Sequence, residues 1–197
     1  MNELCLLALG GNLPSRVGTP ENTLAAALKW LNTGPIRLVS VSRFFQTPCF
    51  PAGAGPDYIN AAAVVSTALP PNELLQALHH IEAEFGRARQ QRWGMRTLDI
   101  DLIAADQTVM PDKATQQAWQ DLSVEKQAQT APDQLILPHP RLQDRAFVLG
   151  PLCDVAKDWR HPLIGLTLGE LYAQLPKTDR DALVACDSVL VKGRKAP

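Results

Sequence analysis

Two aspartates separated by one residue stand directly after an arginine-rich segment near the middle of the chain. Asp99 and Asp101 alternate with the apolar Leu98, Ile100 and Leu102, as side chains do on the two faces of a β-strand. The Cα atoms of the two aspartates would lie about 6.6 Å apart, twice the rise of about 3.3 Å per residue. Both carboxylates can then reach one hard cation or a close pair of cations. Mg²⁺ is the natural candidate, because it prefers oxygen ligands and often shares them with phosphates.

The segment before the aspartates carries Arg87, Arg89, Arg92 and Arg96. Two like charges about 7 Å apart repel by roughly 2.4 kcal/mol at an effective dielectric of about 20, so solvent, arginine or metal must offset the repulsion. Alternation of polar and apolar residues is by itself typical of an ordinary half-solvated strand. The arginines tilt the interpretation towards a metal and phosphate site, although Arg89 and Arg92 are also consistent with solvated loop charges.

The rest of the pattern predicts the elements that must position these side chains. The expected order is a strand over 4–9, a helix from Pro20 to a stop at Gly34, strands over 36–46 and 58–67, a helix after Pro70 that ends at Gly86, and a strand over 97–105. This βαββαβ order predicts a ferredoxin-like α+β fold, in which an antiparallel sheet carries its helices on one face. Substrate would lie on the other face, where the aspartates point.

Length and composition limit the possible functions. A chain of 197 residues with 46% hydrophobic content is long enough for one well-packed core, so we expect a single domain over 1–197. The net charge of −1 gives no overall attraction to nucleic acid or to an anionic membrane. The apolar run over 4–9 is far too short to span a bilayer, and the four cysteines are scattered without metal-ligand spacing. We expect a cytoplasmic protein that binds small molecules, as a monomer or alternatively a dimer.

Several short motifs occur together and in one order along the chain. They are Leu9-Gly10-Gly11-Asn12-Leu13, Gln46-Thr47-Pro48, Pro56-Asp57-Tyr58-Ile59-Asn60-Ala61-Ala62, Ile81-Glu82 with Phe85-Gly86-Arg87, Arg92-Trp93-Gly94-Met95-Arg96-Thr97-Leu98-Asp99-Ile100-Asp101, Leu137-Pro138-His139-Pro140, and Asp144-Arg145-Ala146-Phe147-Val148-Leu149-Gly150-Pro151-Leu152. In this combination, over about residues 4–165, the chain resembles the 6-hydroxymethyl-7,8-dihydropterin pyrophosphokinases. The resemblance implies a Mg²⁺-dependent transferase of folate biosynthesis that moves pyrophosphate from ATP to a pterin alcohol and releases AMP.

The resemblance also implies a pterin pocket. A flat heteroaromatic ring needs aromatic faces and a few directed polar groups. The implied pterin-binding residues are Gly10, Thr47, Pro48, Phe50, Tyr58, Asn60 and Phe147. Of these, Tyr58 and Phe147 would sandwich the ring, and Asn60 would hydrogen-bond its edge. Without the resemblance, ordinary core packing is the simpler interpretation of both aromatic residues.

For the second substrate, the resemblance implies ATP bound with two Mg²⁺ ions on Asp99 and Asp101. Together with these aspartates, Arg87 and Arg96 would be catalytic, in a segment from 87 to 96 that we expect to be mobile. The implied nucleotide-binding residues are Glu82, Trp93, Arg96, Leu102, Ile136, His139 and Arg145. Leu102 and Ile136 would contact adenine through backbone hydrogen bonds. No residue stands out as a general base.

The chain departs from the family pattern at three places. Met95 stands where proline is usual, and Gln134 stands where some members have a basic nucleotide contact. The chain also has an insertion over about 107–134, in which 116–129 has modest helical character. After the shared region, a helix over 166–175 and an apolar alternation over 183–191 are expected to pack on the same core as C-terminal additions.

Two other function classes stay open from the residues. Another Mg²⁺-dependent phosphotransferase would share the aspartate pair and the arginines, but it need not keep Tyr58, Asn60 and Phe147 together. A diverged ferredoxin-like protein that only binds pterin or nucleotide would be expected to lose the aspartates or Arg96 before its fold positions. The chain retains both sets of residues.

Overall fold

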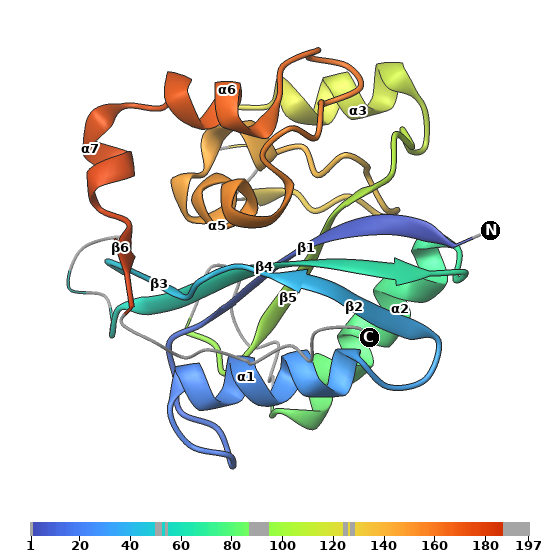
Figure 1. Ribbon diagram of the computed structural model, residues 1–197. Helices are drawn as coiled ribbons and strands as arrows, with labels where there is room; N and C mark the ends of the chain where they lie inside the picture. The colour runs from blue at the N-terminus through green and yellow to red at the C-terminus, as the bar shows by residue number, and fades with distance from the viewer. Residues whose placement is uncertain are drawn as a thin grey trace.

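The computed structural model describes residues 2–49, 53, 55–86, 95–123, 126 and 129–186 (Figure 1). Its elements, in chain order, are β1 (Glu3–Gly11), α1 (Pro20–Leu31), β2 (Ile36–Val41), β3 (Phe45–Thr47), β4 (Tyr58–Thr67), α2 (Pro71–Glu84), β5 (Asp99–Ala105), α3 (Lys113–Gln120), the 3-10 turn η1 (Leu142–Asp144), α5 (Ala146–Ala156), α6 (Leu168–Gln174), α7 (Lys177–Asp181) and β6 (Val184–Ala185). The first seven elements follow the βαββαβ order expected from the sequence, with its second strand in two pieces.

The strands form one antiparallel sheet in the order β5-β1-β4-β3-β6, and β2 also pairs with β4. The prediction of a continuous strand over 36–46 is wrong in one respect, because the observed strand is interrupted between β2 and β3. There the Ser42 amide donates to the Ala62 carbonyl at 2.9 Å, and the Ala62 amide donates to the Ser42 hydroxyl at 2.8 Å. The Ser42 hydroxyl, and not a backbone carbonyl, therefore accepts the hydrogen bond from the Ala62 amide. Both pieces still pair with β4, as the expected hairpin requires.

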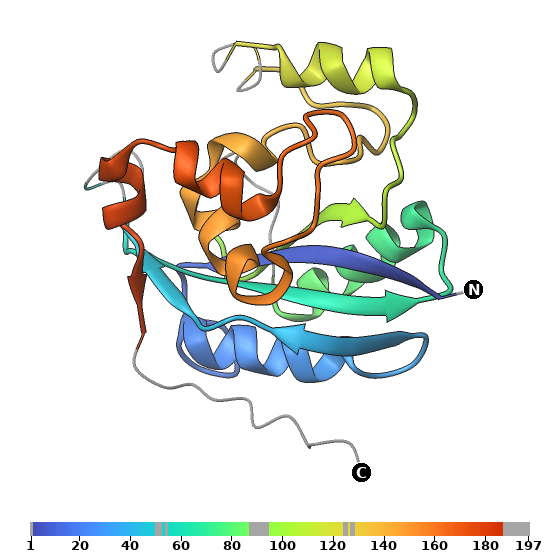
Figure 2. The same cartoon turned by 45° about the horizontal axis from the view of Figure 1, so that its top comes forward.

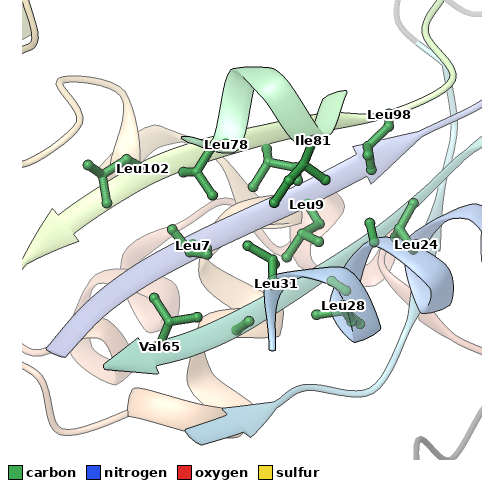
Figure 3. Packing of buried hydrophobic residues seen from close by; sticks show 14 of the residues in the cluster. Leu7, Leu9, Leu24, Leu28, Leu31, Val65, Leu78, Ile81, Leu98 and Leu102 are labelled. Carbon is green, nitrogen blue, oxygen red and sulfur yellow. The ribbon is translucent and has the colours of Figure 1, made fainter. Parts of the chain in front are cut away.

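One face of the sheet is covered by α1 and α2, as the ferredoxin-like pattern predicts. Thr19 caps α1, since its side chain accepts from the Asn22 amide, and Pro20 occupies the first turn. Figure 3 shows the leucines of α1 together with Leu78 and Ile81 of α2 lying over β1, β4 and β5. Leu28 is fully buried in this cluster. Its truncation to alanine would cost about 2–5 kcal/mol.

The opposite face is partly covered by α5 and α6, which lie above the sheet in Figures 1 and 2. Val148 and Leu149 of α5 pack with Leu6 of β1 and Val64 of β4 in a second buried cluster. The expectation that this face is open for substrate therefore applies only beside this cluster. There Asp99, at the start of β5, keeps partial exposure.

The insertion and the C-terminal segments form short elements. The segment over 116–129, in which a short helix or an ordered loop was expected, overlaps α3 only up to Gln120. This helix begins at Lys113, because Asp112 caps it by accepting from the Thr115 amide at 3.0 Å. The helix expected over 166–175 is α6, and the alternation expected over 183–191 contains β6 within its described part. None of the described helices is both long and apolar enough to cross a membrane.

Candidate active site

The strand register places three predicted site residues in one row across the sheet. Gly10 of β1 pairs with Asn60 of β4 on one side and with Asp99 of β5 on the other. Directly paired residues share a face, so Asn60 and Asp99 flank a glycine floor. A Cβ at Gly10 would stand 3.1 Å from Asn60 Oδ1, so glycine leaves room for this amide. The Asn60 Nδ2 donates to Thr47 Oγ1 at 2.8 Å, which fixes the side-chain orientation.

Asp101 belongs to the next row on the same face, opposite Ala8 of β1, whose other neighbour is Ala62. Side chains two residues apart along a strand point the same way. The site therefore has a floor of small side chains, with both aspartates standing on one edge strand. The predicted alternation is confirmed over Asp99–Leu102, where half-buried aspartates alternate with buried Ile100 and Leu102.

Arg96 is the basic partner of this pair. Its guanidinium forms an ion pair with Asp99, and the two side chains are only 21% and 16% exposed. Burial alone would lower the pKa of Arg96, but Asp99, Tyr58 and Asp101 together raise it above its usual value. Burial raises the pKa of Tyr58, while Arg96 acts in the opposite direction. The phenol is therefore neutral and the guanidinium charged at neutral pH.

Asn12 holds the backbone at Arg96, although sequence reasoning gave it no role. The Asn12 amide donates to the Arg96 carbonyl at 3.0 Å, and the Arg96 amide donates to Asn12 Oδ1 at 2.9 Å. Asn12 Nδ2 also donates to the Pro56 carbonyl at 3.0 Å, and the residue is buried. This side chain joins three segments of the site. In the sequence, Asn12 could have been recognised as a site residue because it directly follows the first strand and its two glycines.

A second basic group approaches the aspartates from the segment after the insertion. The His139 amide donates to the Ile103 carbonyl of β5 at 2.8 Å, and His139 Nδ1 accepts from the Arg141 amide at 3.1 Å. In the neutral ring the proton is then on Nε2. Burial and the charge of Arg145 lower the pKa of His139 to about 3, so the ring is neutral at pH 7.

Arg145 completes the basic side of the site. Burial lowers the pKa of Arg145, while the carboxylate of Asp101 acts to raise it. The Arg145 Cζ lies 5.7 Å from the centre of the Phe147 ring, within the range of a cation–π contact. Sequence reasoning also missed Arg141. Its Nε lies 3.2 Å from Asp144 Oδ2, and its positive charge lies beside His139 and Arg145. In the sequence, Arg141 could have been recognised from its position two residues after His139 of the Leu137-Pro138-His139-Pro140 motif.

Two predicted aromatic contacts lie on this face of the sheet. Tyr58 begins β4, two residues before Asn60, and is half-buried. Phe147 comes from the first turn of α5 and is 41% exposed. Pro48 is exposed beside Thr47. These positions leave the predicted pterin contacts available to a ligand.

Three predicted nucleotide contacts are buried. Glu82 of α2 is 1% exposed, and its Oε1 accepts from the Ile100 amide at 2.7 Å. Because β5 is an edge strand, Glu82 occupies the place that another strand would take and holds the peptide between the two aspartates. The side chains of Leu102 and Ile136 are also buried, and the contacts expected from them involve backbone groups. The predicted nucleotide contacts of Glu82, Leu102 and Ile136 stay predictions.

Three further predictions, for Phe50, Arg87 and Trp93, fall outside the described residues, as does most of the segment from 87 to 96. The described part of the site thus contains both aspartates, Arg96, His139 and Arg145. Anionic and cationic side chains meet there beside a neutral phenol and an amide. Such an arrangement can hold a phosphate chain and its cations next to a flat polar ring.

Comparison with known proteins identifies relatives of this chain. The sequence profile of the family described as 7,8-dihydro-6-hydroxymethylpterin-pyrophosphokinase (HPPK) matches residues 6–157. A 2-amino-4-hydroxy-6-hydroxymethyldihydropteridine pyrophosphokinase of Pseudomonas aeruginosa is 38% identical over 86% of this chain and 90% of its own length. The protein of the same name from Synechocystis is 34% identical over 88% of this chain and 76% of its own length.

Among solved structures, wild-type Plasmodium falciparum HPPK-DHPS matches with a TM-score of 0.63 over 88% of this chain. The sequence identity is 13%, so this likeness concerns the fold alone, and the chain spans 41% of that longer protein. The profile match covers most of the chain, and the relatives cover nearly all of it. The chain therefore belongs to the 7,8-dihydro-6-hydroxymethylpterin-pyrophosphokinase family.

Proposed function

We propose that the protein transfers pyrophosphate from ATP to 6-hydroxymethyl-7,8-dihydropterin, releasing AMP, in folate biosynthesis. The observation that carries the proposal is that basic groups gather at the two aspartates: Arg96 forms an ion pair with Asp99, and Asp101 acts to raise the pKa of Arg145. Pyrophosphoryl transfer depends mainly on positioning and on electrostatic stabilisation of phosphate oxygens. These groups supply both.

The pterin is assigned to the row that contains Gly10 and Asn60. The amide of Asn60 is fixed by Thr47 and retains hydrogen-bonding capacity for the edge of a heteroaromatic ring. Tyr58 and Phe147 provide aromatic surface on the same face of the sheet. The glycine floor lets a flat ring approach the backbone. In this arrangement the hydroxymethyl group would face the aspartates.

The aspartates suit Mg²⁺. Asp99 and Asp101 offer hard carboxylate oxygens, and in the described ranges no group of three or more His, Cys, Asp or Glu gathers. Mg²⁺ is usually bound by one or two protein carboxylates together with substrate phosphates and waters, so a larger protein cluster is not required. We assign Asp99 and Asp101 as the protein ligands of two Mg²⁺ ions. When bound, the ions would neutralise phosphate charge and lower the pKa of the pterin hydroxyl.

The basic side chains are assigned to the phosphates. Arg96 is paired with Asp99 and can exchange this contact for phosphate oxygens, to which its planar fork is well suited. Arg145 and the Nε2–H of neutral His139 provide further donors. Because neutral His139 carries no charge, it can orient a phosphate without adding to the repulsion between the nearby Arg141 and Arg145. Proton removal from the pterin hydroxyl is not assigned to any side chain.

The experiment is to incubate the purified protein with Mg²⁺, ATP and 6-hydroxymethyl-7,8-dihydropterin and to identify the products by chromatography and mass spectrometry. Equal amounts of AMP and pterin diphosphate are expected. ADP with a pterin monophosphate would overturn the proposal in favour of an ordinary kinase. Pterin binding without any reaction would indicate a diverged binding protein. The control is the same reaction with Asp101→Asn.

A further inference from the structure

The peptide group between Pro138 and His139 is held from two sides. Its N–H, from His139, donates to the Ile103 carbonyl of β5 at 2.8 Å. Its C=O, from Pro138, accepts from Gln116 Nε2 of α3 at 3.1 Å. The two groups of a trans peptide point in opposite directions, so the plane of this peptide is fixed between β5 and the inserted helix. The orientation of that plane sets the direction in which the His139 side chain leaves the backbone.

Gln116 is not needed to close the insertion. Met110 and Leu137, at its two ends, form an antiparallel bridge in which each amide donates to the carbonyl of the other, at 2.9 and 3.1 Å. The start of α3 is fixed separately by the Asp112 cap. The hydrogen bond from Gln116 is therefore additional to the contacts that return the chain to the sheet.

The side chain of Gln116 is fully buried, and its Oε1 has no hydrogen-bond partner among the residues that the structure describes. A buried amide with an unsatisfied oxygen is destabilising. An apolar residue of similar length would fill the space without that cost. Packing alone therefore does not explain a glutamine at this position. The hydrogen bond from its Nε2 to the Pro138 carbonyl does.

We propose that Gln116 is a positioning residue for the nucleotide, acting by fixing the Pro138–His139 peptide so that His139 Nε2–H is directed at the phosphates. The inference rests on the proposed nucleotide contact of His139. Two contacts then define the donor: Gln116 fixes the peptide, and the Arg141 amide at Nδ1 fixes the ring. The inserted helix α3 thereby becomes part of the machinery that binds ATP.

The first test is Gln116→Met, which keeps the length of the side chain and removes its donor. Loss of one hydrogen bond worth about 1 kcal/mol corresponds to a roughly fivefold rise in the KM for ATP. The kcat should change by less than about twofold, and the KM for the pterin should not change. The matched control is Gln117→Met, one residue further along α3, where the glutamine is exposed and donates to Asp121 at the C-cap of the same helix. The control should leave all three constants unchanged.

The second test repeats Gln116→Met in a His139→Ala background, with ATP affinity and thermal unfolding measured for each variant. If Gln116 acts through His139, the second substitution causes no further loss of ATP affinity. An equal loss in both backgrounds would overturn the inference, as would a folded Gln116→Met with unchanged KM for ATP. If His139→Ala leaves ATP affinity unchanged, the assigned contact of His139 is wrong and this inference falls with it. Product identity would still test the pyrophosphokinase proposal separately.

A third variant keeps the inference open to refutation if Gln116→Met does not fold. Asp112→Ala removes the exposed cap of α3 and leaves the buried amide in place. Loosening the helix should raise the KM for ATP in the same direction, by a smaller factor, without a change in the KM for the pterin. An Asp112→Ala protein in which both constants rise equally would contradict the specific link to the nucleotide.

Discussion

Substitution of Gly11 by alanine should displace the backbone at Arg96, the arginine that we propose to be catalytic, without contact to its side chain. A Cβ at Gly11 would stand 2.5 Å from the Thr97 carbonyl oxygen and 3.2 Å from the Thr97 carbonyl carbon. An ordinary contact begins at 3.4 Å, so the Thr97 backbone must retreat by about 0.9 Å. Backbone atoms cannot rotate away as a flexible side chain does. The displacement must therefore be shared by the neighbouring residues.

Arg96 is the neighbour that has least freedom to absorb this shift. Its carbonyl accepts from the amides of Asn12 and Leu13, which follow Gly11 directly, and its amide donates to Asn12. Overpacking of this kind costs about 1–3 kcal/mol. Each kcal/mol lowers Tm by about 2–4 °C in a chain of this size. A displacement of about 1 Å at a catalytic group can lower turnover by about a hundredfold, and we expect a loss of kcat of that order.

The assay combines AMP formation at saturating substrates with thermal unfolding monitored by circular dichroism. The control is Gly169→Ala in α6, where the new Cβ would meet only the flexible Lys157 side chain, at 3.0 Å. That control should keep full kcat and an equal or higher Tm, because alanine favours helix. A Gly11→Ala protein with unchanged kcat and Tm would refute the argument. A fall in Tm with normal kcat would show that Arg96 is not displaced.

The remaining predictions concern charge and pH. Asp101→Asn should lower Mg²⁺-dependent AMP formation by about a hundredfold or more with little change in Tm, and substantial activity would contradict the metal assignment. Arg96→Lys keeps the charge but loses the planar fork, so kcat should fall by about ten- to a hundredfold, and an unchanged kcat would count against the phosphate contact. Burial lowers the pKa of His161 to about 4 from 6.5, so its contribution to stability, complete above pH 6.5, is lost as the pH falls towards 4. The slope reaches about 1.4 kcal/mol per pH unit, and His161→Asn should flatten this part of a urea-midpoint profile. An equal slope in that variant would disprove the assignment.

Local patterns were sufficient to predict much of the sheet and its first helical layer. Leu98, Ile100 and Leu102 all enter the core beneath α1 and α2, as their period of two predicts, and α1 begins at Pro20 as expected. The break at Ser42 was missed because its cause is a bond to Ala62, a residue on another strand. No property of the segment from 36 to 46 taken alone reveals that bond.

The site was predictable to the extent that its residues occur in recognisable motifs. Asn60 and Asp99 were identified, but their placement on either side of Gly10 depends on strand register, which spacing along the chain does not determine. Asn12 and Gln116 were missed because each acts by a hydrogen bond to the backbone of a distant segment. Such bonds have no sequence pattern of their own. The covering of the second face was also missed, because no helix was predicted over Ala146–Ala156.

The bridge between Met110 and Leu137 has a consequence for chain entropy. The bridge closes most of the insertion into a loop, and the entropic cost of closing a loop grows only with the logarithm of its length. Each doubling of such a loop costs about 0.6 kcal/mol, so the step from a connection of about six residues to one of this length costs on the order of 1 kcal/mol. A single well-placed hydrogen bond can offset that amount. A helix can therefore be added at this point of the fold while the sheet keeps its order, and the added helix can come to lie against the segment that contains His139.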